Sequence, residues 1–353
     1  MSIMAHHSDA TPAKAAASGQ PLVEVEELRV KFVSRDATVW AVNGVSFQLM
    51  PGEVLCLIGE SGSGKTVTMR ALMRLLPRNR AVLSGRMRVG GRDILRLSEA
   101  ELTQVRGSEI AMVFQEPMTA LDPVYTIGHQ IAETVMRHEG CSRRAATARA
   151  LELLRLVRVP SPERRLAAYP HELSGGLRQR ATIAVALSCR PSLLLADEPT
   201  TALDATVQIQ VLILLRKLQA ELGMSVIIVT HDLGVAAQIA DKVAVMYAGR
   251  IVEYGSARDV LLHPAHPYTI GLLNSTVHGQ SRERDIEAIP GSPPDLRALA
   301  PGCSFRPRCA FVRPACASDV PPPLAMPSGS TACCLRAREL AEARARTTTE
   351  VVT

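Results

Sequence analysis

One short segment constrains the fold of this chain more than any other. Residues 59–66 read GESGSGKT and match the pattern G-x-x-x-x-G-K-[ST]. The apolar run Val54–Ile58 precedes this segment, and residues 67–76, which have helical spacing, follow it as far as Pro77. Glycines in such a loop let backbone N–H groups turn inward around a phosphate. The sequence therefore predicts a strand, a phosphate-binding loop and a helix, in that order.

The side chains of this loop predict that it binds a nucleotide together with magnesium. Lys65 would supply positive charge to the outer phosphates, and Thr66 would offer its hydroxyl to Mg²⁺. A plain glycine-rich turn is the alternative, and the strand before the loop and the helix after it disfavour that interpretation. The residues expected to contact the nucleotide here are Gly59, Ser61, Gly62, Ser63, Gly64, Lys65 and Thr66.

Two neighbouring carboxylates follow another apolar run. Leu193–Ala196 is typical of a strand buried on both faces, and it leads directly into Asp197 and Glu198. Ligands of open α/β sheets bind at the carboxyl ends of the strands. We expect Asp197 to hold Mg²⁺ through water. Glu198 would point the other way on an extended chain and act as general base on the attacking water.

A third segment predicts a second anion site. Residues 173–180 read LSGGLRQR, and Ser174 is a natural N-cap for a helix that continues through the apolar text up to Arg190 and Pro191. The simplest interpretation is a capped helix with a glycine-rich entry. A helix N-terminus flanked by glycines also binds anions, and this chain already has one complete phosphate loop. Ser174, Gly175 and Gly176 therefore suggest a nucleotide held between two subunits.

The remaining text predicts an α/β fold with a mainly parallel sheet. Strand-like runs alternate with helical segments such as Val207–Leu222, and residues 242–247 and 251–254 resemble a hairpin. Strand signals vanish between Gln115 and Leu173, where Arg- and Ala-rich text indicates a helical insertion. Aromatic residues are only 3% of the chain, so we expect an aliphatic core and no stacking platform for nucleic acid.

Charge and hydropathy exclude several other classes of protein. The formal net charge of +6 is too small and too dispersed to indicate a nucleic-acid binder. No apolar run approaches the ~18–20 residues that span a bilayer, and residues 1–20 lack the apolar core of a signal peptide. We therefore expect a cytosolic chain whose first 20 residues form a flexible tail.

Taken in order, these motifs resemble the nucleotide-binding domain of an ABC transporter over roughly residues 22–265. In that family the glutamine of VFQEP, here Gln115, touches Mg²⁺ and the attacking water. Asp204 in TALD resembles the D-loop aspartate, and His231 after SVIIVT resembles the switch histidine at the γ-phosphate. The family stacks adenine on an upstream aromatic residue, for which Phe32 fits the usual place and Trp40 is the alternative.

The chain from His263 onward resembles the ATP-binding subunits of oligopeptide and dipeptide importers. The resemblance rests on HPAHPYTIGLL, IPGSPPDL and PGCSFRPRCAFVRPAC, and on a late cysteine. Four thiolates in a small Pro-rich unit suit a metal centre better than disulfides in a reducing compartment. Some members carry a [4Fe–4S] cluster on this pattern, and free thiols are the alternative. The expected ligands are Cys303, Cys309, Cys316 and Cys333, with Cys334 competing for the last place.

The resemblance implies a RecA-like α/β core with an antiparallel β portion and a helical subdomain, plus a small Cys-rich C-terminal domain. The expected divisions are 1–20, 21–265 with the helical subdomain at about 117–180, 266–340 and 341–353.

It also implies an ATPase at the cytoplasmic face of the inner membrane that energises peptide import. Its partners would be a second ATP-binding subunit or a second copy, two permease subunits and an external solute-binding protein, with no nucleic acid. An importer of nickel or another small solute, a non-transport ABC ATPase and a P-loop kinase are the alternatives.

Overall fold

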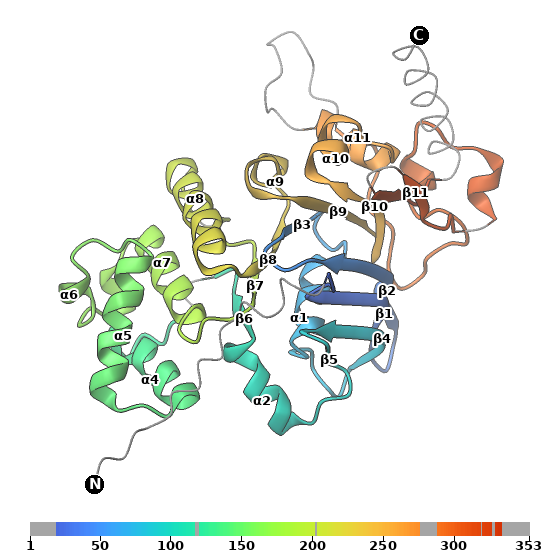
Figure 1. Cartoon of the computed structure of the whole chain (residues 1–353). Helices are drawn as coiled ribbons and strands as arrows, with labels where there is room; N and C mark the ends of the chain where they lie inside the picture. The colour runs from blue at the N-terminus through green and yellow to red at the C-terminus, as the bar shows by residue number, and fades with distance from the viewer. Residues whose placement is uncertain are drawn as a thin grey trace.

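The computed structural model describes residues 19–116, 120–201, 203–275, 288–318, 320–326 and 329–333. Two sheets and the helices beside them form one lobe, and a group of helices forms a second lobe (Figure 1). Most of the predicted tails, 1–20 and 341–353, lies outside the described residues. Among the described residues, no helix has both the length and the apolar character that crossing a bilayer requires.

The larger sheet has eight strands in the order β11-β12-β10-β9-β3-β8-β7-β6. The five strands from β9 to β6 run parallel, and β10 pairs with β9 in the antiparallel sense. The parallel strands are β3 (Val54–Ile58), β6 (Ile110–Val113), β7 (Leu193–Asp197), β8 (Ser225–Thr230) and β9 (Lys242–Tyr247). The predicted parallel α/β sheet is confirmed.

Strand β3 shows why the sequences of these strands are continuous apolar runs. All five of its residues are buried, and successive side chains enter different cores. Leu55 and Leu57 pack toward the smaller sheet, whereas Val54, Cys56 and Ile58 pack toward the helices on the other face. A strand covered on both faces has no side that favours polar residues.

The smaller sheet covers one face of the larger one. Its order is β2-β1-β4-β5, all antiparallel, and α1 packs between it and the parallel strands. Its strands are β1 (Val23–Val33), β2 (Thr38–Leu49), β4 (Ala81–Val89) and β5 (Arg92–Asp93). The sequence predicted neither β4 nor β5. It also missed α2 (Glu99–Ser108), which begins with a capping box formed by Ser98 and Glu101.

Helix α1 (Lys65–Leu72) is shorter than the sequence predicts. The apolar pattern continues to Leu76, but the helix ends at Leu72 because Arg74, two residues later, has a φ of 48°. The Leu75 amide donates back to Arg70 O at 2.9 Å, as in a Schellman ending. The Arg74 side chain also donates to the Ile94 carbonyl, which ties this turn to the smaller sheet.

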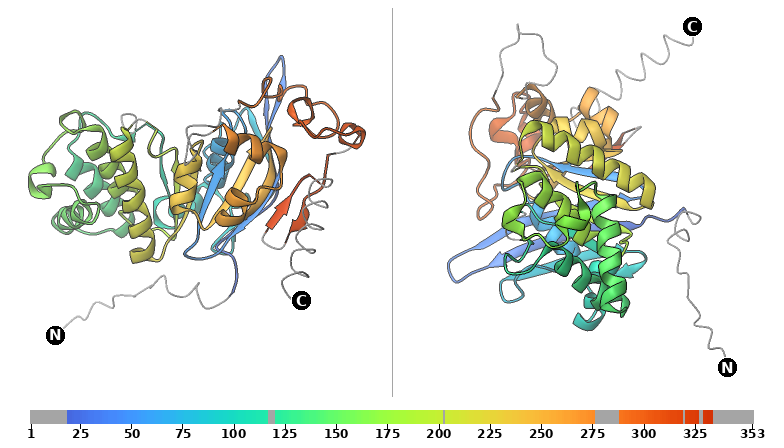
Figure 2. Two further views of the ribbon diagram at one scale, coloured as in Figure 1. Left: turned by 90° about the horizontal axis from the view of Figure 1, so that it is seen from above. Right: turned by 90° about the vertical axis from the view of Figure 1, so that its left-hand side faces the viewer.

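The second lobe is helical, and Figure 2 shows it standing apart from the sheets. Helices α4, α5 and α7 pack against one another. Helix α7 also contacts α8 and strand β6, which connects the helices to the larger sheet. The helices concerned are α4 (Ile127–Glu139), α5 (Arg143–Leu156), α6 (Pro162–Arg165), η2 (Pro170–Glu172), α7 (Gly175–Ala186) and α8 (Ala205–Leu222). No strand lies between residues 120 and 173, where the sequence predicted helices.

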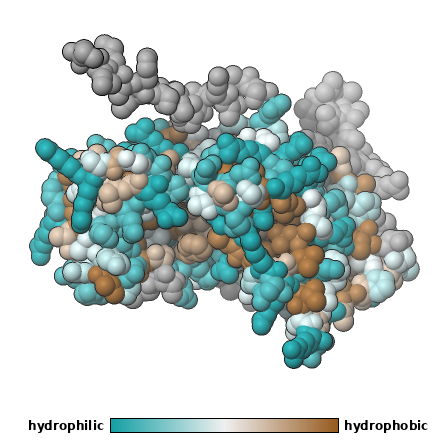
Figure 3. Space-filling view, turned by 90° about the horizontal axis from the view of Figure 1, so that it is seen from below, coloured by the Kyte–Doolittle hydropathy of each residue, from teal (hydrophilic) through white to brown (hydrophobic). Residues whose placement is uncertain are grey.

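The C-terminal segment returns to the edge of the larger sheet. Strand β12 (Gly329–Thr331) pairs with β10 (Arg250–Ser256), which extends the predicted hairpin of β9 and β10. The other elements here are α9 (Leu233–Ile239), α10 (Ala257–Leu262), α11 (Pro267–Asn274), η3 (Arg306–Arg308), η4 (Pro314–Ala317) and β11 (Leu324–Met326). The face seen from below is largely hydrophilic, with hydrophobic residues gathered in patches (Figure 3).

Candidate functional site

The carboxyl ends of four parallel strands deliver the predicted chemistry to one edge of the larger sheet. The glycine-rich loop follows β3, and Asp197 ends β7 with Glu198 directly after it. His231 follows β8, and Gln115 lies two residues beyond β6. Because β6, β7, β8 and β3 are consecutive neighbours in the sheet, residues far apart in the chain meet here.

The glycines of the loop are required by its conformation. Gly64 has φ 104°, and a Cβ there would clash with the carbonyl oxygen of Ala41. Gly59 also has positive φ, and a Cβ there would collide with the carbonyl oxygen of Met246. Gly62 has φ 76° with open space around it, and Ser61 beside it is exposed. The backbone therefore forms a tight loop with an exposed outer side.

Two polar side chains of the loop lie inside it. The Lys65 ammonium donates to the carbonyl oxygens of Gly59 at 2.8 Å and Glu60 at 2.9 Å. Burial lowers the pKa of Lys65, while the carboxylates of Glu198 and Asp197 oppose that shift. The Ser63 hydroxyl is buried and has no hydrogen-bond partner among the residues that the structure describes. Both groups can hydrogen-bond to a phosphate without first breaking a link to another side chain.

Thr66 and Asp197 form a pair suited to a magnesium ion. The Thr66 hydroxyl donates to Asp197 Oδ1 at 2.8 Å. Asp197 Oδ2 is buried and has no hydrogen-bond partner in the described part of the chain, and burial raises the pKa of this carboxyl. A buried carboxylate oxygen without a partner is costly unless a cation or water satisfies it. The oxygen donors of this pair fit Mg²⁺.

Glu198 is the centre of a polar cluster that joins three sheet strands. Its Oε2 accepts hydrogen bonds from Thr201 Oγ1 at 2.8 Å and from Gln115 Nε2 at 3.3 Å, and it lies 3.4 Å from His231 Nδ1. The sequence predicted an extended backbone at Glu198, and that was wrong. Its φ is 46°, and its amide donates to Val229 O at 3.0 Å, so the chain turns here at the edge of the sheet.

The residues predicted to touch the nucleotide from a second subunit lie apart from this cluster. Ser174 is the N-cap of α7, but its side chain makes no capping hydrogen bond and is exposed. Helix α7 belongs to the helical lobe, away from α1 (Figures 1 and 2). Gly176 lets α7 approach α8, because a Cβ there would lie 2.5 Å from Val207 Cγ1. Asp204 caps α8, accepting from the Val207 amide at 3.0 Å.

The two candidates for adenine stacking have different surroundings. Phe32 is half-buried in β1 and packs against the core of the smaller sheet. Trp40 is half-buried in β2, with the Lys31 ammonium 5.4 Å from the centre of its ring. Its neighbour Ala41 contacts the turn at Gly64, so Trp40 is tied by the backbone to the phosphate loop.

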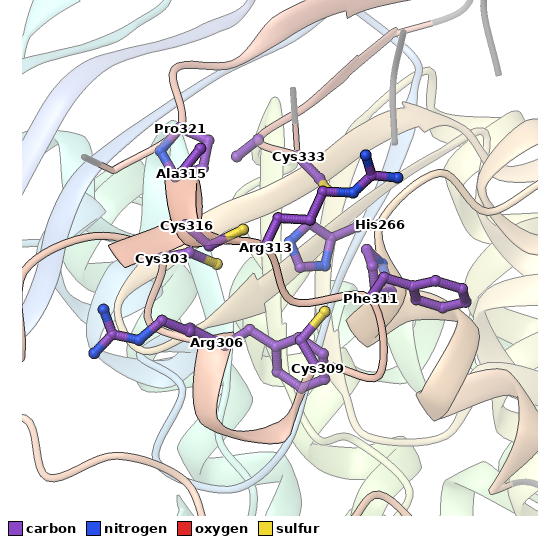
Figure 4. Close-up of a pocket in the computed structure, with 13 residues that line it drawn as sticks. His266, Cys303, Arg306, Cys309, Phe311, Arg313, Ala315, Cys316, Pro321 and Cys333 are labelled. Carbon is purple, nitrogen blue, oxygen red and sulfur yellow. The ribbon is translucent and has the colours of Figure 1, made fainter. Parts of the chain in front are cut away.

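The four cysteines predicted as ligands line one cavity of about 60 Å³ beside α11. Their sulfur atoms face its interior in Figure 4, next to the His266 ring. Burial raises the pKa of the Cys303 and Cys309 thiols, and it lowers the pKa of His266 to about 3. Within the described residues, no three His, Cys, Asp or Glu side chains are close enough to hold one metal ion. Cys334 lies outside that part of the chain.

Comparison with known proteins identifies the family. Residues 42–201 match the model of the ABC transporter family, and residues 252–316 match the C-terminal region of oligopeptide/dipeptide transporters. The chain is 47% identical over 326 residues to the oligopeptide transport ATP-binding protein OppD of Salmonella typhimurium, covering 92% of this chain and 97% of that one. This chain belongs to the ABC transporter ATP-binding proteins.

Other relatives support the same family. The dipeptide transport ATP-binding protein DppD of Bacillus subtilis is 48% identical over 291 residues, which cover 82% of this chain and 87% of the relative. Among solved structures, a dimeric ATP-binding cassette with bound ADP and phosphate is 29% identical, with a TM-score of 0.60. It aligns with 67% of this chain and 99% of its own. The predicted ABC family is thereby confirmed.

Sequence reasoning missed two contacts at the site of this ABC ATPase. Thr201 holds Glu198, and the spacing of three residues between them was the available signal. Arg308 forms a two-pronged ion pair with Glu60 of the phosphate loop, at 2.7 and 3.0 Å. These two residues are 248 positions apart, so only the fold brings them together.

Proposed function

We propose that this chain binds and hydrolyses ATP to drive the import of di- and oligopeptides through separate permease subunits. One observation carries the proposal: the phosphate loop, Asp197, Glu198, Gln115 and His231 converge at one sheet edge. The match of residues 252–316 to the oligopeptide/dipeptide transporter region favours peptides over nickel or another small solute.

The phosphate loop would hold the triphosphate in this proposal. Lys65 would exchange its two carbonyl partners for oxygens of the outer phosphates, and Ser63 would use its unpartnered hydroxyl. Thr66 and Asp197 would hold Mg²⁺, which supplies positive charge to the outer phosphates. Phe32 or Trp40 would stack on the adenine, and comparing ATP with GTP binding in Phe32→Ala and Trp40→Ala distinguishes them.

Glu198 would act as general base on the attacking water. Its Oε2 accepts from Gln115 and Thr201, so the carboxylate is held in one orientation. His231 lies beside the same oxygen and can donate a hydrogen bond toward the γ-phosphate side of the site. The proton taken from water would remain on the Glu198 carboxyl until the phosphate leaves.

A second ATP-binding subunit, identical or homologous, would complete the site. The Ser174 hydroxyl is exposed and makes no capping bond in its own helix, so it is available to another molecule. The helix N-terminus behind it favours an anion. We propose a head-to-tail pair in which Ser174, Gly175 and Gly176 of one subunit contact the γ-phosphate bound by the other. Asp204, at the start of α8, would lie at the same interface.

The segment between Gln115 and Gln130 would contact the permease. Within it, Val124 is 72% exposed and Tyr125 is 48% exposed, although both are large and apolar. Gln115 ties the start of this segment to Glu198, so movement of the segment reaches the catalytic carboxylate directly. We also propose that the chain lies at the cytoplasmic face of the membrane. A solute-binding protein would deliver peptide to the permease from the opposite, external side.

We also propose that Cys303, Cys309, Cys316 and Cys333 hold a [4Fe–4S] cluster. Four thiols surround one cavity, and an all-thiol donor set suits such a cluster. Anaerobically purified protein should absorb near about 400 nm and contain about four irons per chain. Stoichiometric zinc, or no metal, would refute this assignment.

The proposed function is tested by purification from membranes. The tagged chain should carry along two permease subunits, and its ATPase rate in vesicles should rise with peptide and solute-binding protein. A rise with nickel instead of peptide would favour the alternative importer. Recovery without any permease would favour an ABC ATPase that does not act in transport.

A further inference from the structure

The side chain of Arg308 joins residues 303–316, called here the cysteine-rich segment, to the phosphate loop. It is only 4% exposed, and it comes from η3, directly before Cys309. Its Nη1 and Nη2 donate to the two carboxylate oxygens of Glu60 at 2.7 and 3.0 Å. Its Nε donates to Pro290 O at 2.8 Å, so the guanidinium is held on both sides. Two parallel hydrogen bonds to a carboxylate fix orientation as well as charge.

Glu60 is held a second time by the C-terminal segment. Its amide donates to the Tyr268 hydroxyl at 2.8 Å, and Tyr268 is fully buried in α11. The Tyr268 ring packs against Tyr247 and Phe305, with centroids 4.6 and 5.4 Å apart. Tyr268 therefore positions the backbone of Glu60 and Arg308 positions its side chain, and both residues come after the last parallel strand in the sequence.

The charge of Glu60 matters because of where it lies. It is the second residue of the phosphate loop, and its carbonyl accepts from the Lys65 ammonium at 2.9 Å. An unpaired carboxylate at this place would repel a polyphosphate and compete for Lys65. A guanidinium keeps its positive charge in proteins, so the two hydrogen bonds from Arg308 also place a positive charge directly beside the Glu60 carboxylate.

Building on the proposed ATP site, we propose that Arg308 is a positioning residue for the phosphate loop. It neutralises Glu60 and fixes its side chain, so that ATP affinity depends on the folded cysteine-rich segment. Cys303 and Cys316 shape that segment, since the Cys303 amide donates to Cys316 O at 2.9 Å and the Arg308 amide to Phe305 O at 2.9 Å. Disturbing these loops would move the guanidinium, and with it the carboxylate of Glu60.

The test is a double-mutant cycle on ATP affinity in the full chain. Arg308→Ala should weaken MgATP binding by about 5- to 30-fold, because it leaves the Glu60 carboxylate unpaired. Glu60→Gln alone should change the affinity by less than about threefold. In the Glu60→Gln background Arg308→Ala should cost less than about threefold, since no charge remains to neutralise.

A purely structural Arg308 would behave differently in this cycle. Its removal would cost the same in both backgrounds, and that result refutes the proposal. Should Arg308→Ala fail to fold, Arg308→Lys carries the same comparison, with a smaller loss expected because the charge is kept. Arg155→Ala is the matched control, since it breaks the exposed pair with Glu163 in the helical lobe and should leave affinity unchanged. Wild type without ATP affinity would refute the proposed function itself.

Discussion

Asp197→Asn separates the magnesium role of Asp197 from its structural role. Asp197 is 1% exposed, Oδ1 accepts from Thr66, and Oδ2 is buried without a partner. The asparagine keeps the acceptor for Thr66 and removes the charge that burial disfavours. We expect the free energy of unfolding without nucleotide to change by less than about 1 kcal/mol, because the lost charge offsets the new unpaired amide.

The ligand-linked stability should change much more. At a MgATP concentration about 100 times the dissociation constant, binding stabilises the wild type by about 2.7 kcal/mol. With an unfolding entropy of about 2.1 cal/mol/K per residue, the 353 residues convert this into a Tm rise of about 4 °C. A 10- to 100-fold loss of affinity, typical of removing a partner from a metal site, leaves about 0.4 to 1.4 kcal/mol. The rise in the variant should then be only about 0.5 to 2 °C.

Differential scanning fluorimetry with and without MgATP measures both quantities for each protein. Scans with ATP and EDTA provide the control, and there the two proteins should differ little. An equal Tm rise for variant and wild type would show that Asp197 does not support the metal. A loss of more than about 3 kcal/mol without nucleotide would show that the carboxylate is structural instead.

Three further predictions follow from particular contacts. Glu198→Gln should lower ATP turnover by about 10²- to 10⁴-fold while keeping the ATP dissociation constant within about threefold, and turnover near the wild-type rate would remove Glu198 from its role as base. Asp241→Ala should lower the free energy of unfolding in urea by about 2 kcal/mol, because Asp241 accepts hydrogen bonds from the Val54 amide and from Arg216. Asp241→Asn keeps the bond from the Val54 amide, so it should lower this free energy by about half as much or less. Burial raises the pKa of Cys189 to about 11 and of Cys56 to about 12. At pH 8, Cys189 in the native protein should therefore alkylate about 100-fold more slowly than in urea, and its alkylation rate should rise about tenfold per pH unit. Cys56 should react only after unfolding. Mass spectrometry of the alkylated peptides checks the last prediction, and native labelling of Cys56 within minutes would contradict it.

Much of the nucleotide site could be predicted from sequence because its elements are local. The buried strands, the glycine pattern around Lys65 and the carboxylates Asp197 and Glu198 at the end of β7 each span only a few residues, and the parallel sheet brings the strand ends together. The small edge strand β5 and helix α2 carry short or weak patterns, so they were missed. The helix after the loop ended early because Arg74 adopts positive φ, which its residue type does not predict.

The contacts between distant segments could not be predicted in the same way. The pairing of Arg308 with Glu60 depends on how the C-terminal segment packs against the end of β9, where Tyr247 contacts Tyr268 and Phe305, and neither residue type signals it. The turn at Glu198 depends on its hydrogen bond to Val229 in the neighbouring strand. In both places tertiary packing decides the conformation, and single-residue preferences do not.

The most direct test of the account is the mass of the Glu198→Gln protein in MgATP, measured by light scattering, alone and with the partner ATPase subunit recovered from membranes. We predict about twice the 38.0 kDa of one chain in at least one of these samples, and a return to single subunits when Ser174→Arg blocks the N-terminus of α7. Subunits that stay single in MgATP, or a pair that Ser174→Arg leaves intact, would contradict the claim that two subunits hold one nucleotide.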